Sequence, residues 1–156
     1  FTMTLTVLAF SFQPSQATAQ SVQQGGEAKT PKELAGMMAT SCPGSWETQA
    51  CLANVSETVL HMAADYAATL QQAGHSAAIE RLKQKCAAAT AATSQDVPAY
   101  ALESALTECV NNVYDIQNQV NIKPNENLYQ IVVVSTLCLS KDRRCGEIED
   151  QLMQYQ

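Results

Sequence analysis

The stretch of residues 41–72 constrains the fold most, because it opens with two closely spaced cysteines and continues as one long amphipathic segment. Cys42 and Cys51 bracket a Pro-Gly turn, and no further helix breaker follows before Gly74. Apolar residues recur every three or four positions, which at helical spacing places them in one stripe. The stripe consists of Cys51, Val55, Val59, Met62, Tyr66 and Leu70. We expect Ser45 to cap a helix of roughly 27 residues, or about 40 Å, whose stripe other helices cover.

Other segments supply those helices. A capping box at Thr30 and Glu33 starts a short first helix. Ser76 can cap another, which we expect to fray after Cys86, and a further one starts near Pro98 and runs to Val120. The last covers residues 145–155, with Tyr155 on its apolar face. The sequence therefore predicts an all-α fold, a disulfide-stapled bundle of five or six helices, over a single domain of residues 30–156.

The run Leu128–Leu139 is ambiguous. Its β-branched residues favour a strand by propensity. Helical segments flank it, and the sequence predicts no second strand with which it could pair. We therefore favour a buried helix and keep the strand as the alternative.

The first residues indicate export. An uncharged apolar run, residues 2–12, precedes the small-x-small pattern of residues 17–19. The run is too short to span a bilayer. We interpret residues 1–19 as a signal peptide that is truncated at its N-terminus, with a buried helix or strand as the alternative. Residues 20–29 are polar and glycine-containing, and we expect a flexible mature N-terminus there.

Six cysteines agree with export, because an even number in a short exported chain favours disulfides over free thiols. The predicted location is therefore the periplasm or the extracellular space. Our first choice is sequential pairing, and a bridge between Cys109 and Cys138 is the main competitor, because antiparallel helices around Pro124 would bring these two level. The sequential pairs are Cys42 with Cys51, Cys86 with Cys109, and Cys138 with Cys145.

Few residues suggest chemistry. Glu57, His61 and Asp65 share one helix face, but that face points away from the apolar stripe, so we expect solvated side chains rather than a metal or a base. Trp46, the only tryptophan, could be an exposed anchor for a partner, but we favour a lid on the core beside a disulfide. Two basic clusters could meet an acidic partner, although a solvated helix face is the simpler interpretation. Those clusters are Arg81, Lys83 and Lys85, and then Lys141, Arg143 and Arg144.

Charge and motifs exclude several functions. The net charge of −6 argues against nucleic acid as a partner. The sequence has no G-x-S-x-G, no H-E-x-x-H and no phosphate-binding glycine loop, and we expect no enzyme, no cofactor and no metal. We therefore predict a non-enzymatic protein–protein interaction module, such as a subunit of a bacterial envelope assembly or an inhibitor-type binder. The alternative is a carrier that holds a small apolar ligand between helices, with candidate lining residues Met37, Met38, Met62 and Tyr66.

Overall fold

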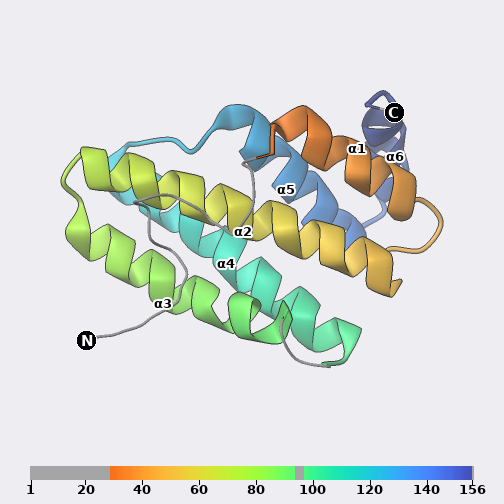
Figure 1. The fold of residues 1–156 in the computed structure, drawn as a ribbon, viewed down its shortest axis with the longest axis horizontal. Coiled ribbons are helices and arrows are strands. Elements are labelled where there is room, and N and C mark those ends of the chain that lie inside the picture. The colour runs from red at the N-terminus through yellow and green to blue at the C-terminus, as the bar shows by residue number, and fades with distance from the viewer. Residues whose placement is uncertain (1–28, 94–96, 156) are drawn as a thin grey trace. The chain divides into compact units, whose positions relative to one another are not determined.

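The computed structural model describes residues 29–93 and 97–155, and their regular structure is entirely helical (Figure 1). The segments interpreted as signal peptide and mature N-terminus lie outside the described residues, apart from Lys29. Within the described part, the helices are α1 (Pro31–Ser41), α2 (Gln49–Gln72), α3 (Ser76–Thr93), α4 (Ala99–Val120), α5 (Glu126–Leu139) and α6 (Cys145–Met153). The predicted all-α, disulfide-stapled bundle is confirmed. None of these helices combines the length and the apolar character needed to cross a membrane.

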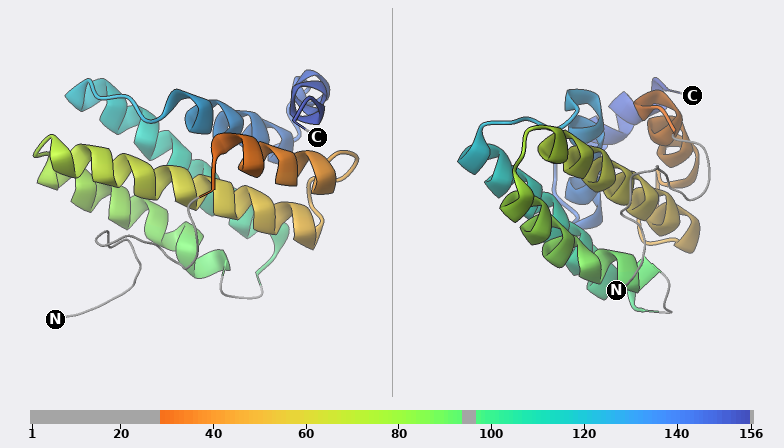
Figure 2. Two further views of the ribbon diagram at one scale, coloured as in Figure 1. Left: turned by 45° about the horizontal axis from the view of Figure 1, so that its top comes forward. Right: turned by 60° about the vertical axis from the view of Figure 1, so that its left-hand side comes forward.

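The central helix is α2, which contacts α1, α3, α4 and α5. Figure 2 shows α3 and α4 along one side of it and α1 along the other. All members of the predicted apolar stripe are completely buried, so the periodicity identified the core face correctly. They are Cys51, Val55, Val59, Met62, Tyr66 and Leu70.

The start of α2 differs from the prediction. The helix has 24 residues, and its N-cap is Thr48, whose hydroxyl accepts a hydrogen bond from the Cys51 amide at 3.2 Å. Ser45 instead closes a turn, its amide donating to the Cys42 carbonyl at 3.0 Å. Both Ser45 and Thr48 can cap a helix, and Thr48, which follows the turn that Ser45 closes, does so. At the other end the helix stops where expected, since Gly74 adopts a positive φ of 83°.

The ambiguous run is a helix, α5, as favoured. Asn125 caps it by accepting a hydrogen bond from the Leu128 amide at 3.0 Å. Ile131, Val132 and Cys138 are buried along it, so tertiary packing overrides the strand propensity of the β-branched residues. The helix packs on α1, α2, α4 and α6.

Two smaller expectations are wrong. The helix α3 does not fray after Cys86 but continues to Thr93, because the added residues are mostly alanine and Ala89 is fully buried. Tyr155 lies beyond the end of α6 and is exposed, because that helix already ends at Met153.

The disulfides follow the sequential pattern. One clips the α1–α2 loop, one joins α3 to α4, and one clips the α5–α6 turn, with Cα–Cα distances of 4.7, 4.5 and 4.7 Å respectively. The competing bridge between Cys109 and Cys138 is not formed, because Cys109 is bonded to Cys86 and Cys138 to Cys145. No cysteine in the described part is free.

Candidate functional site

A hollow of about 690 Å³, the α3–α4 hollow, runs along the outer face of α4. Most of its residues recur every three or four positions on α4, on the side away from the buried stripe that contains Leu102, Leu106 and Cys109. Arg81 and Lys85 reach the hollow from α3. The α4 residues are Tyr100, Glu103, Ser104, Thr107, Glu108, Asn111, Asn112 and Asp115.

Two of the predicted partner-binding residues are held by ion pairs in this hollow. Arg81 lies 3.6 Å from the Asp115 carboxylate and donates a hydrogen bond to Gln119 at 2.9 Å. Lys85 lies 3.6 Å from Glu108. The side chains are substantially exposed, so each pair contributes little to stability, at most about 1 kcal/mol. Their effect is to neutralise charge along the shared edge of α3 and α4.

A second hollow, of about 220 Å³, lies between the start of α4 and the two loops at that end of the bundle; we call it the end hollow. Its charged members include Lys141 and Glu47, whose Nζ and Oε2 atoms are 3.1 Å apart. Tyr100 and Glu103 line both hollows. The complete lining is Glu47, Leu52, Ala99, Tyr100, Glu103, Leu139, Ser140 and Lys141.

Two residues in these hollows have unusual surroundings, one because of its exposure and one because of a buried atom without a hydrogen bond. Tyr100 is 75% exposed, the highest value among the large hydrophobic side chains of the described residues. Asn112 is only 4% exposed, yet its Oδ1 atom has no hydrogen-bond partner among the described residues. Buried amide oxygens are normally bonded, so this acceptor is a local cost to stability. None of Tyr100, Glu103 and Asn112 was predicted from the sequence, in which the available signal was a tyrosine on the polar face of a helix.

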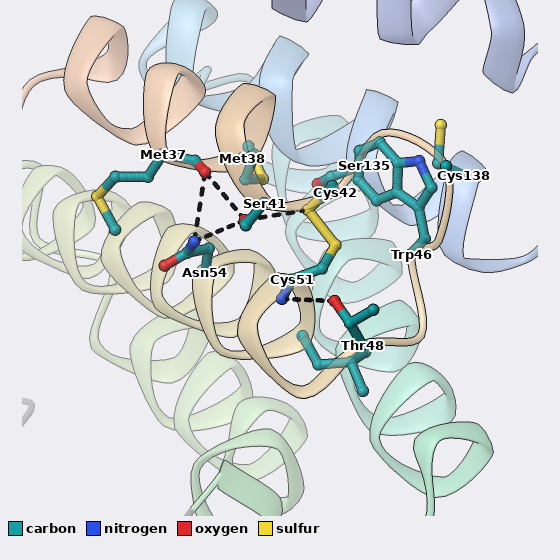
Figure 3. Close-up of a disulfide and its surroundings, with 12 residues drawn as sticks. Met37, Met38, Ser41, Cys42, Trp46, Thr48, Cys51, Asn54, Ser135 and Cys138 are labelled. Atoms are coloured by element: carbon teal, nitrogen blue, oxygen red, sulfur yellow. Dashed lines mark hydrogen bonds between the residues drawn. A yellow bond between two sulfur atoms is a disulfide. The ribbon is translucent and has the colours of Figure 1, made fainter.

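The burial of Trp46 agrees with the favoured interpretation, a lid on the core beside a disulfide, and not with an exposed anchor. The indole is only 7% exposed, and Nε1 donates a hydrogen bond to Glu149 Oε2 at 3.0 Å. The same oxygen accepts from the Gly44 amide at 3.1 Å. Figure 3 places Trp46 in the surroundings of the Cys42–Cys51 disulfide. Trp46 therefore links the α1–α2 loop to α6.

The side chain of Asn54 is engaged beside this disulfide (Figure 3). Its Nδ2 donates to Ser41 Oγ at 2.8 Å and to the Met37 carbonyl at 3.3 Å. The amide therefore joins the early part of α2 to the last turn of α1.

The remaining basic candidates lie apart from the hollow on α3 and α4. Arg144 binds the Asp142 carboxylate through Nε at 2.8 Å and Nη2 at 3.0 Å, and its backbone amide binds the same group at 2.9 Å. These hydrogen bonds lower the pKa of Asp142 to about 2. Lys83 and Arg143 are exposed. Lys83, Arg143 and Arg144 line neither hollow, so each basic cluster is only partly represented there.

The helix face of Glu57, His61 and Asp65 is less solvated than expected. Glu57 and His61 are half-buried, whereas Asp65 is exposed at its surface. Partial loss of water nevertheless raises the pKa of Asp65, and the attraction of His61 opposes that rise. Within the described part of the chain, no three His, Cys, Asp or Glu residues are grouped so that they could hold a metal ion.

The residues expected to line an apolar cavity belong to the core. Met38, Met62 and Tyr66 are completely buried, and Met37 is half-buried. The Tyr66 hydroxyl donates to the Ile122 carbonyl at 2.6 Å, which ties the second half of α2 to the loop before α5. None of these four residues lines either of the two hollows described above.

Comparison with known proteins yields no relative. The chain matches no protein-family model, and no curated protein and no solved structure is similar to it. The residues themselves must therefore support any function.

Proposed function

We propose that this protein is an exported, non-enzymatic interaction module that binds another protein through the outer face of α4. It would act as a subunit of a bacterial envelope assembly or as an inhibitor-type binder. The observation that carries the proposal is the pair of adjoining hollows that share Tyr100 and Glu103.

The composition of these hollows suits a protein partner. Their walls are mostly charged, hydroxyl and amide side chains, with one exposed aromatic ring between them. Protein interfaces combine a polar rim with aromatic anchors, and tyrosine is enriched among the residues that dominate binding energy. An apolar carrier site, by contrast, would be lined mainly by hydrophobic side chains.

The disulfides support export. Three bridges in a small domain are compatible with an oxidising compartment, where such bonds persist. The acidic balance, a net charge of −6, favours a partner with a basic surface over nucleic acid.

The direct test is native mass spectrometry of the full chain purified from its own source without denaturant. We expect a stoichiometric complex with a second protein that survives in Tyr114→Ala but is lost in Tyr100→Ala. Tyr114 is the matched control, because it is also an exposed tyrosine of α4, at 53%, and lines neither hollow.

A lipid-sized adduct in place of a second protein would overturn the proposal in favour of the carrier. Equal loss of the complex in both variants would move the interface away from the hollows.

A further inference from the structure

The charges that line the two hollows balance, with one exception. Across the described lining there are three cationic side chains and four carboxylates. Each cation has a carboxylate partner within 3.6 Å, and the three pairs are Arg81 with Asp115, Lys85 with Glu108, and Lys141 with Glu47. Glu103 is the carboxylate that remains, and within the described residues it has neither an ion pair nor a hydrogen bond.

Glu103 lies one helical turn after Tyr100. Side chains three positions apart on a helix are neighbours, with Cβ atoms about 5–6 Å apart. Both residues line both hollows, so ring and carboxylate border the same space where the hollows meet. Tyr100 is 75% exposed, so most of its surface is open to a ligand.

An exposed aromatic face beside a carboxylate without a counter-ion attracts an organic cation. The ring quadrupole draws a guanidinium or ammonium group within about 6 Å of its centre, and the carboxylate accepts that group's hydrogen bonds. A metal ion fits less well, because hard cations prefer several oxygen ligands and Glu103 is a single carboxylate. A guanidinium fits best, because it can stack on a ring while bonding a carboxylate in its own plane.

We infer that Tyr100 and Glu103 form the recognition point for one arginine side chain of the partner protein, with lysine as the weaker substitute. This inference rests on the proposed function and specifies the partner: a protein that presents an arginine from a basic surface. The acidic net charge of the chain would draw such a surface in and speed the encounter.

The test is an NMR titration of the oxidised, ¹⁵N-labelled full chain with N-acetyl-arginine amide. The matched probe is N-acetyl-citrulline amide, which has nearly the same shape but no charge. We expect saturable shifts of the backbone amides of residues 99–104 and 139–141 with the arginine compound, and no saturable shifts with citrulline over the same range.

Variants assign the effect to the two side chains. Glu103→Gln should weaken arginine binding by about threefold or more, in keeping with the loss of one partly exposed ion pair. Glu80→Gln makes the same change of net charge outside both hollows and should leave the affinity unchanged. Tyr100→Phe should retain binding, because the ring remains, whereas Tyr100→Ala should lose it.

Several results would overturn the inference. These are equal shifts with arginine and citrulline, shifts centred elsewhere on the chain, or full affinity in Glu103→Gln. The same amides responding to a neutral disaccharide, chitobiose, but not to the arginine compound would assign the hollows to carbohydrate. The two proposals can fail separately. Arginine binding without any co-purifying protein would support the cation site but refute the interaction module. A partner that depends on Tyr100 but binds Glu103→Gln equally well would support the interaction module but refute the cation site.

Discussion

Two regions of the molecule surround their aromatic residues in opposite ways. One is the clipped end, by which we mean the loops closed by the Cys42–Cys51 and Cys138–Cys145 bridges together with α6, and the other is the outer face of α4. At the clipped end, Trp46 is 7% exposed and its N–H is bonded to Glu149. On α4, Tyr100 is 75% exposed beside a carboxylate that has no counter-ion among the described residues. Satisfied groups in a buried setting stabilise the fold, whereas unsatisfied groups on the surface are available to a partner. Trp46, the only tryptophan of the sequence, therefore serves stability.

The largest expected effect contrasts these two aromatic residues directly. Trp46→Ala should lower the free energy of unfolding by about 3–5 kcal/mol, because it leaves a cavity and strips Glu149 of a donor. Tyr100→Ala should change it by less than about 0.5 kcal/mol, since the side chain is exposed. Urea unfolding of the oxidised proteins, followed by far-ultraviolet circular dichroism, measures both without relying on tryptophan fluorescence. Similar losses in the two variants would refute the division between the regions.

The disulfides provide the next contrast. The Cys86–Cys109 bridge closes 23 residues and the Cys138–Cys145 bridge closes 7. In the chain-entropy model the longer loop restricts the unfolded chain more, so the double alanine variants should lose about 3.5 and about 2.5 kcal/mol respectively. The same unfolding assay compares them. A larger loss for the shorter loop would mean that native packing at the clipped end, rather than loop entropy, sets the value of its bridge.

Removal of the Glu149 side chain should have a smaller effect, again confined to the clipped end. Its Oε2 atom accepts hydrogen bonds from Trp46 and Gly44, and both donors lose their partner in Glu149→Ala. We expect a loss of about 1–3 kcal/mol in the free energy of unfolding. The neighbouring exposed residue supplies the control, and Asp150→Ala should stay within about 0.5 kcal/mol of the wild type. If both variants behave alike, the link between the α1–α2 loop and α6 contributes nothing.

The helices could be predicted from the sequence because their signals are local. The stripe on α2 and the glycine after α2 are each contained in a few residues. The predicted cap of α2, Ser45, is wrong, and Thr48 is the cap. Both residues can cap a helix and they lie three positions apart, so only the geometry of the disulfide loop decides between them.

The role of Trp46 and the candidate site could not be assigned in the same way. The partner of Trp46 is 103 residues away in the chain, and nothing near the tryptophan points to it. The hollows exist only because α3 and the two end loops pack around α4. Which carboxylate lacks a counter-ion depends on that packing as well, so Glu103 looks no different in the sequence from Glu108.

The smallest expected effect is the response of the clipped end to acid, through Asp142. Hydrogen bonds from Arg144 lower the pKa of this carboxyl to about 2, below its ordinary value of 3.8. Because the pKa is lower in the folded state, the ionised pair stabilises the fold above the ordinary value and loses that contribution as the pH falls through about 2. The Arg144 side chain is exposed and that of Asp142 half-buried, so the effect on unfolding is small and the titration itself is the better measurement. In ¹³C NMR the Asp142 carboxyl should titrate near 2 in the wild type. In Arg144→Gln it should titrate closer to 3.8.

Arg143→Gln is the control and should leave the midpoint almost unchanged, because Arg143 acts on Asp142 only through a weak charge interaction. A shift of the same size in both variants would mean that diffuse positive charge, rather than the forked hydrogen bonds of Arg144, holds the proton off the carboxylate.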